Sequence, residues 1–211
     1  MEIVAEGVEV AGPHGPLLAP TSLRIRDGQA LLVTSDPGAG GTALALVLSG
    51  RLRPTRGTVL LDGAAAPKAL RRRVAVVDSP EITEPEGSVP VRDVVAEGLS
   101  IAGRSSRKNA VRAWLHEHGL QQHADERFEN VPATERTRLL VDLAADGRRT
   151  DALILDHPDR HGAEPEDWYE PARREAERGR AVVVLCSPRS AEELSPAPAR
   201  IGADNRELQQ Q

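Results

Sequence analysis

The stretch TSDPGAGGTALALVLS (residues 34–49) has the residue types and spacing of a loop that could bind phosphate. Such a loop uses glycines so that backbone N–H groups can turn onto phosphate oxygens, and it leads into a helix whose N-terminus favours an anion. It also needs a lysine for the outer phosphates and a Ser or Thr hydroxyl for Mg²⁺, in the pattern GxxxxGK[ST]. Here Gly40 and Thr42 match, Ser35 replaces the first glycine, and Gly41 replaces the lysine.

The neighbours of this loop favour a binding role. An apolar run typical of a buried strand (29–34) precedes the loop, and an apolar segment typical of a helix (42–52) follows it. The alternative is a glycine-rich turn between strand and helix that binds nothing. On the binding interpretation, the phosphate contacts are Ser35, Pro37, Gly38, Ala39, Gly40, Gly41, Thr42 and Ala43.

Asp156 is the second candidate for chemistry, because it ends the apolar run ALILD. Its carboxylate and the Thr42 hydroxyl would give Mg²⁺ two oxygen ligands, whereas the alternative is a purely structural aspartate at a strand end. His157 follows and could accept a proton. Cys186 ends the run AVVVLC and has no evident His or Asp partner set, so we expect it in the core.

The segments that position these residues are apolar runs typical of strands, which alternate along the chain with amphipathic runs typical of helices. The alternation predicts an α/β fold with a largely parallel sheet. Residues of about 80–135 read as a helical lobe, because they contain amphipathic segments and a Pro/Glu-rich loop. The expected strands are 3–10, 22–26, 29–34, 57–63, 74–78, 152–156 and 181–186. The expected helices are 42–52, 66–73, 91–99, 109–120, 135–146 and 167–178, the last a surface helix whose start Pro171 obscures.

The composition narrows the possible classes of protein. A length of 211 residues suits one large domain, and a formal net charge of −5 gives no electrostatic reason to expect nucleic-acid binding. One cysteine excludes an internal disulfide and suits a reducing compartment. The N-terminus lacks the pattern of a secretory signal, and no run approaches the length of a membrane span.

From about residue 3 to about residue 203 the chain resembles the ATP-binding subunit of ATP-binding cassette (ABC) transporters. The resemblance lies in the order and spacing of several segments, among them PGAGGTALALVLSGRLRPTRGTVLLDG, RRRVAVV, ERTRLLVDLA, ALILDHP and AVVVLCSP. It implies a single nucleotide-binding domain over residues 1–211, with a P-loop NTPase-like sheet, an antiparallel β-subdomain and the helical lobe inserted at about 80–135. It also implies ATP and Mg²⁺ as ligands, with Mg²⁺ on Thr42 and Asp156. The implied partners are an integral membrane transport protein and a second ATPase subunit or copy of the chain, at the inner face of the membrane.

The same alignment shows that most of the family's catalytic positions have changed. The family's adenine-stacking aromatic falls near Ala11, with His14 the only ring nearby, and its signature sequence becomes VPATE (131–135). The other replacements are Gly41 for the P-loop lysine, Asp78 or Ser79 for the Q-loop glutamine, His157 for the catalytic glutamate, a residue near Ala163 for the D-loop aspartate, and Ser187 for the switch histidine.

These losses lead to the hypothesis of a catalytically impaired ABC subunit that docks to or regulates a membrane complex. Weak or absent ATP binding is expected, because backbone donors remain but the charged contacts do not. Two alternatives stay open. The chain could be an active ABC ATPase subunit that depends on a competent partner subunit, or it could be an unrelated P-loop enzyme.

Overall fold

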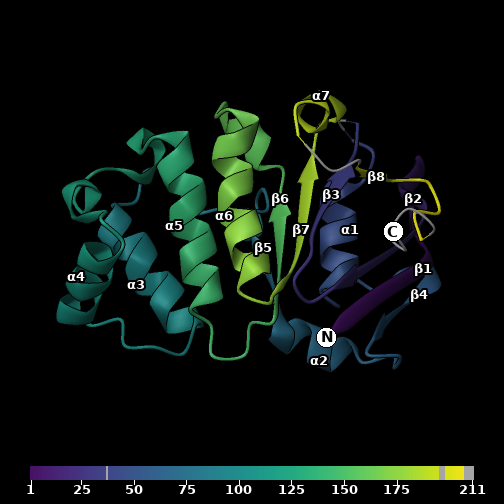
Figure 1. Cartoon of the computed structure of the whole chain (residues 1–211), viewed down its shortest axis with the longest axis horizontal. Helices are drawn as coiled ribbons and strands as arrows, with labels where there is room; N and C mark the ends of the chain where they lie inside the picture. Colours follow the sequence, from purple (N-terminus) through teal and green to yellow (C-terminus); the bar gives the residue numbers. More distant parts are fainter. Residues whose placement is uncertain (37, 195–197, 207–211) are drawn as a thin grey trace.

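The computed structural model describes residues 1–36, 38–194 and 198–206 (Figure 1). Its strands are β1 (Glu2–Gly12), β2 (Gly15–Arg26), β3 (Ala30–Thr34), β4 (Arg56–Leu61), β5 (Val74–Val77), β6 (Ala152–Asp156), β7 (Ala181–Cys186) and β8 (Ala199–Arg200). Its α-helices are α1 (Gly41–Leu48), α2 (Pro67–Arg73), α3 (Val91–Ile101), α4 (Lys108–Glu117), α5 (Ala133–Ala145), α6 (Pro165–Glu177) and α7 (Pro188–Glu192). Short 3-10 helices are η1 (Gln121–His123), η2 (Phe128–Asn130) and η3 (Pro158–His161).

The central sheet is parallel, with strand order β5-β6-β7-β3-β8. The aliphatic runs of β6 and β7 are buried along their whole length, as expected for strands that are covered on both faces. In register, Val184 of β7 lies between Leu32 of β3 and Leu155 of β6. Because the strands are parallel, the loops that follow β3, β5, β6 and β7 all meet at one edge of the sheet.

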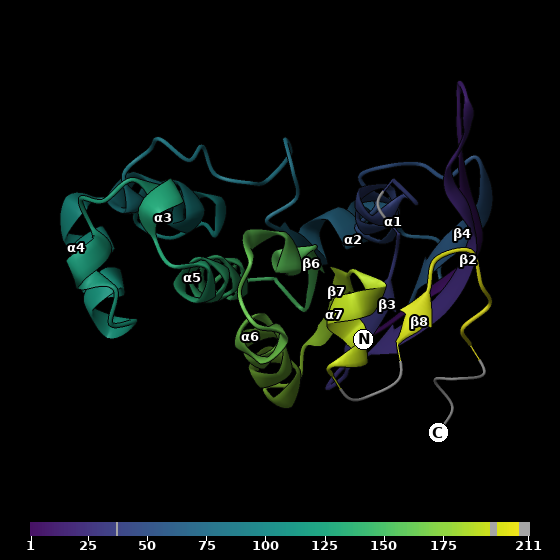
Figure 2. The same ribbon diagram turned by 90° about the horizontal axis from the view of Figure 1, so that it is seen from above.

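A separate antiparallel sheet has the order β2-β1-β4 and stands at one end of the molecule (Figure 2). The strands predicted at 3–10 and 22–26 are in fact a long hairpin, in which β2 begins at Gly15. The start of β2 could not be recognised from the sequence, because Pro16 and Pro20 interrupt the pattern expected of a strand. β2 is an edge strand, where a residue without an N–H group is tolerated.

Helices α3, α4 and α5 lie at the other end of the molecule, beyond α6 (Figure 1). Their apolar residues recur at helical spacing, as with Val91, Val94 and Val95 in α3. The helix predicted at 167–178 is α6, which is amphipathic and exposes Asp167, Glu170 and Arg173 to solvent. Helix α6 begins earlier, with Pro165 in its first turn, and it buries Trp168 completely.

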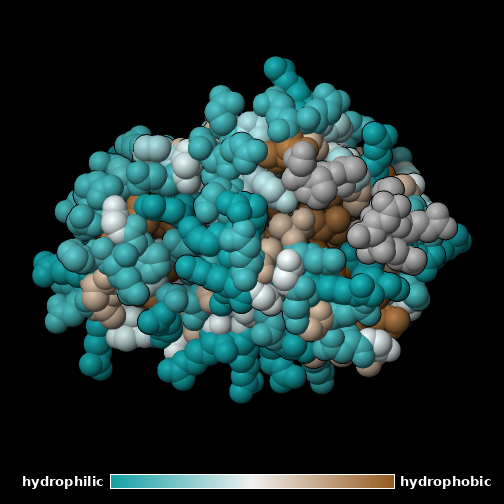
Figure 3. Space-filling model, in the orientation of Figure 1, coloured by the Kyte–Doolittle hydropathy of each residue, from teal (hydrophilic) through white to brown (hydrophobic). Residues whose placement is uncertain are grey.

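Two hydrophobic cores lie on opposite faces of the parallel sheet. Val182 and Val184 contribute to the core shared with α3–α6, whereas Val183 and Leu185 contribute to the core shared with α1 and the antiparallel sheet. The face shown in Figure 3 is mostly hydrophilic, with apolar colour in small areas. Within the described residues, no helix is long and apolar enough to cross a membrane. The predicted fold class, a mostly parallel α/β sheet with an antiparallel subdomain and helices, is confirmed.

Candidate functional site

The residues singled out for chemistry meet at the carboxyl edge of the parallel sheet. Ser35 follows β3, Ser79 follows β5, His157 follows β6 and Ser187 follows β7. These positions are separated by up to 152 residues in sequence (187 − 35), and the parallel topology brings them to one edge. Ligands bind at this edge in α/β proteins of this kind.

The glycine-rich loop runs from β3 into α1, as predicted. Gly40 has a φ of 96°, and a Cβ at this position would lie 2.0 Å from the Leu17 carbonyl oxygen, so only glycine fits. No side chain among the described residues caps the N-terminus of α1. The first N–H groups of the helix, at Gly41, Thr42 and Ala43, therefore remain donors for an anion. Of the predicted contacts, Pro37 lies outside the described residues.

The His157 side chain fills the space beside Gly41. A Cβ added to Gly41 would lie 2.2 Å from His157 Cε1, so any side chain at position 41 would overlap the imidazole. The ring is held at both nitrogens, with Nε2 2.8 Å from the Ser35 hydroxyl and Nδ1 2.7 Å from Asp156 Oδ1. Gly41 and His157, which the resemblance aligns with the family's lysine and glutamate, therefore fit each other.

Asp156 is the centre of this network and is fully buried. Its Oδ2 atom accepts hydrogen bonds from Thr42 Oγ1 at 2.8 Å and from Ser79 Oγ at 2.6 Å, while Oδ1 pairs with His157. Burial alone would raise the pKa of Asp156, but the hydrogen bonds from His157, Ser79 and Thr42 outweigh it and leave the pKa below its ordinary value. The two predicted Mg²⁺ ligands therefore lie together, and they bond directly to each other.

A cavity of about 570 Å³ opens in front of the loop. It is lined by the loop glycines, His157 and two acidic residues, Asp36 and Asp159, with Leu17 half-exposed in its lining. The Thr42 hydroxyl and the Asp156 carboxylate suit Mg²⁺. Arg160 also lines the cavity, but its guanidinium pairs with Asp78 and Glu84. The His157 imidazole fills the space where a lysine side chain at position 41 would begin, so the described residues offer the outer phosphates no cation at that position.

The segment at the family's signature position is engaged within its own chain. Pro132 precedes the first residue of α5 and has no N–H to offer a phosphate. The Thr134 hydroxyl donates to Asp167 Oδ2 at 3.3 Å. At the switch position, the Ser187 hydroxyl accepts from the Ser190 backbone and so caps α7. Both segments have local structural roles.

Sequence reasoning missed a charged cluster beside the site. Arg160 and His161 from η3 contact Asp78 and Glu84, which lie on the loop after β5. The residues come from segments about 80 positions apart and form no local motif. In the sequence, His157 and His161 are four residues apart, but Pro158 and Gly162 favour a loop there, and this spacing does not predict contacts with Asp78 or Glu84.

Cys186 lies in the core, as predicted, with no exposed surface. Burial raises the pKa of its thiol to about 12. We expect the native protein to react with a disulfide reagent at pH 8 far more slowly than the protein unfolded in guanidinium chloride. A colorimetric thiol assay checks this, and fast reaction of one thiol per native chain would contradict the packing described here.

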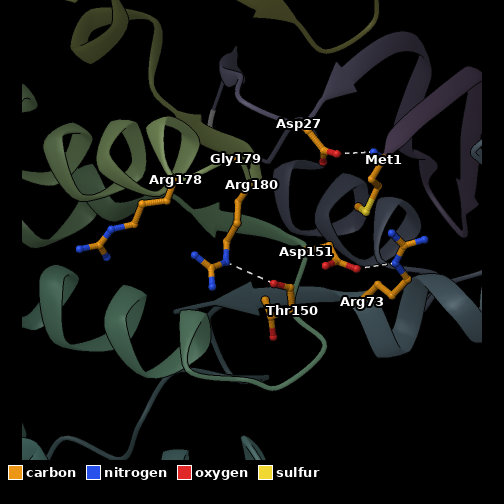
Figure 4. A pocket seen from close by; sticks show the side chains of 8 residues that line it. All are labelled: Met1, Asp27, Arg73, Thr150, Asp151, Arg178, Gly179 and Arg180. Atoms are coloured by element: carbon orange, nitrogen blue, oxygen red, sulfur yellow. Dashed lines mark hydrogen bonds and ion pairs between the residues drawn. The ribbon is translucent and has the colours of Figure 1, made fainter.

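A second polar pocket of about 240 Å³ lies at the opposite, amino-terminal end of the strands (Figure 4). Its charges are paired within the chain. The Met1 amine contacts Asp27, Arg73 contacts Asp151, and Arg180 donates to the Thr150 carbonyl (Figure 4). With these groups paired, the pocket offers little free charge to a ligand.

Comparisons with known proteins agree with the fold and the site. A family model described as ABC transporter matches residues 18–160. The chain is 32% identical over 197 residues to the hemin import ATP-binding protein HmuV of Rhodopseudomonas palustris (strain BisB18), covering 86% of this chain and 71% of that protein. It is 31% identical over 150 residues to the taurine import ATP-binding protein TauB of Yersinia pestis bv. Antiqua (strain Antiqua), covering 68% of this chain and 55% of that protein.

Solved structures give the same result for the fold. A nucleotide-free ATP-binding cassette from an ABC transporter matches with a TM-score of 0.71 and 14% identity, over 97% of this chain and 89% of that chain. Together with the antiparallel sheet beside the loop, these matches exclude an unrelated P-loop enzyme. The chain belongs to the ATP-binding subunits of ABC transporters.

Proposed function

We propose that this chain is an ABC subunit with little or no ATP hydrolysis, which acts as a docking or regulatory component of a membrane transport complex. One observation carries the proposal. The His157 ring occupies the space where the family's lysine would begin, and it is bonded to Ser35 and Asp156. Since relatives of this chain are named as import proteins for hemin and taurine, we place the complex among importers.

Transition-state energetics support impaired hydrolysis. The transferred phosphoryl group needs a lysine, an ordered water and donors from the signature segment, each worth about 3 kcal/mol in comparable sites. Gly41, His157 and Pro132 stand at the corresponding positions. The contributions are not additive, but losing them together removes most of the catalytic stabilisation. The helix N-terminus that remains is worth only about 0.3–1 kcal/mol at an exposed site, so ATP with Mg²⁺ would bind weakly or not at all.

A groove between β5, the loop that follows it, α3 and α5 suits a membrane partner. It has a volume of about 480 Å³ and is lined by apolar residues of β5, α3 and α5. Ile82 and Ile101 are 48% and 81% exposed there, which is unusual for large apolar side chains. The exposed acidic side chains of Glu86 and Glu97 also line it, together with Arg51, which donates to the Val74 carbonyl. An amphipathic helix of an integral membrane protein, apolar on one side and basic on its flanks, would match the groove in shape and charge.

An ATPase assay on the purified protein tests the proposal. We expect no Mg²⁺-dependent release of phosphate above that of a buffer control, because Gly41 and His157 stand where the resemblance places the lysine and the glutamate that act on the γ-phosphate. Asp156→Asn provides the matched control, since it keeps the shape of the carboxylate and removes its charge. Robust turnover by the wild type that Asp156→Asn abolishes would refute impaired hydrolysis. Turnover seen only after addition of a second ATPase subunit would favour the active heteromeric alternative.

A further inference from the structure

The segment 78–86, which forms one wall of the groove, is attached to the turn after β6 by a cluster of charged side chains. Arg160 Nη2 lies 3.0 Å from Asp78 Oδ1 and 3.2 Å from Glu84 Oε1. His161 Nε2 lies 2.8 Å from Asp78 Oδ2. We call Asp78, Glu84, Arg160 and His161 the wall clamp. It connects the groove wall to the residues that surround the phosphate loop.

Arg160 also holds the turn from which it projects. Its Nη1 atom donates to the Asp156 carbonyl at 2.6 Å and to the His157 carbonyl at 3.2 Å. His157 has a φ of 56°, a left-handed conformation that costs a non-glycine residue free energy and needs support from its surroundings. One guanidinium therefore fixes both the turn that carries His157 and the wall of the groove.

The wall is folded on itself by backbone hydrogen bonds. The N–H groups of Ile82, Thr83 and Glu84 all donate to the Ser79 carbonyl, and the Ser79 N–H donates to Thr83 Oγ1. Asp78, at the start of the wall, is 5% exposed and has a φ of 59°. A carboxylate this buried needs polar partners. Among the described residues, Arg160 forms an ion pair with it and His161 Nε2 lies within hydrogen-bond distance of it.

A bound metal ion is a less suitable account of the same cluster. Asp78, Glu84 and His161 place one ligand atom each within 4.8 Å of one another. The Arg160 guanidinium already lies on both carboxylates and offsets part of their charge, so a cation would have to displace it. The contacts of Arg160 and His161 with Asp78 and Glu84 are therefore better described as an ion-pair and hydrogen-bond cluster than as a metal site.

We infer that Arg160 and His161 are positioning residues that order the groove wall without nucleotide, so that the groove keeps one shape whether or not ATP is present. The identity of the groove's occupant, an amphipathic helix of the membrane partner with basic flanks, rests on the proposed function. The ordering of the groove wall by Arg160 and His161 does not depend on it. The wall clamp would make docking constitutive, because Arg160, His161 and Asp156 of this chain contact residues 78–86 directly.

Hydrogen exchange of the full chain, read by mass spectrometry, tests the inference. In the wild type, we expect peptides over 79–86 to be protected, with the same rates in millimolar MgATP and in EDTA. Arg160→Ala should accelerate exchange at 79–86 and 157–161 by about tenfold or more, with the rest of the chain unchanged. Arg160→Lys should give an intermediate rate, because one ammonium cannot reach two carbonyls and two carboxylates together. Arg173→Ala is the matched control, since it removes an exposed ion pair on α6.

Two results would overturn the inference. One is unchanged exchange at 79–86 in Arg160→Ala. The other is wild-type protection that requires MgATP or disappears in EDTA, since the wall would then depend on a ligand. These outcomes are separate from those of the ATPase assay. ATP hydrolysis with an ATP-insensitive wall would refute the proposed function alone, and an unprotected wall in an inactive protein would refute the wall clamp alone.

Discussion

Replacing Gly41 by alanine is expected to destabilise the protein by about 1–3 kcal/mol, the usual cost of overpacking a filled site. The new Cβ would lie 2.2 Å from His157 Cε1, so the ring must move and its bonds to Ser35 and Asp156 weaken. Urea unfolding measures the change in free energy. Gly41→Lys should cost at least as much, so restoring the family's lysine by itself would not restore the family's site.

His157→Ala supplies the control for this prediction, because it removes the ring. In that background Gly41→Ala should be neutral or stabilising by up to about 1 kcal/mol, since alanine is the better helix former at the start of α1. The double-mutant cycle would then show a coupling free energy above about 1 kcal/mol. Equal destabilisation by Gly41→Ala in both backgrounds would mean that the imidazole does not occupy the space beside the loop.

Asp156→Ala is expected to cost about 3–5 kcal/mol of unfolding free energy, which is typical for removing one partner of a buried charged network. Its carboxylate is fully buried and accepts from Thr42 and Ser79 while pairing with His157, so three polar groups would lose their partner together. Thermal or urea unfolding measures the loss. Asp156→Asn should cost less, because an amide keeps one acceptor oxygen.

Asp151→Ala is the matched control for Asp156→Ala. Asp151 lies just before the same strand, but its side chain is 45% exposed and pairs with a partly exposed Arg73, so we expect a cost below about 1 kcal/mol. If Asp156→Ala were as mild as Asp151→Ala, or stabilising, Asp156 would be a carboxylate kept for a metal ion at the expense of stability. The structural account of the network would then be wrong.

Much of this architecture could be predicted from the sequence, because it depends on local patterns. The apolar runs 29–34, 152–156 and 181–186 have the length and composition of buried parallel strands, and the glycine-rich loop lies between a strand and a helix. The order of these segments also indicated the family. The start of β2 was missed because Pro16 and Pro20 break the alternating pattern that identifies a strand.

The arrangement within the site could not be predicted in the same way. The resemblance to the family implies that Gly41 and His157 stand where the family has two charged residues, but it does not indicate that the His157 ring fills the space beside Gly41. That contact depends on the left-handed backbone at His157, which Arg160 supports through two carbonyls. Arg160 in turn pairs with Asp78, 82 positions earlier (160 − 78), and no local pattern links residues so far apart.

Calorimetric titration with MgATP tests the central claim most directly, in the wild type and in Gly41→Lys/His157→Glu. The double substitution removes the ring and restores both family residues at once. We predict no saturable heat for the wild type up to millimolar nucleotide, and saturable binding in the double variant, because the lysine then has room beside the loop. Micromolar binding of MgATP by the wild type would contradict the claim that His157 closes this site.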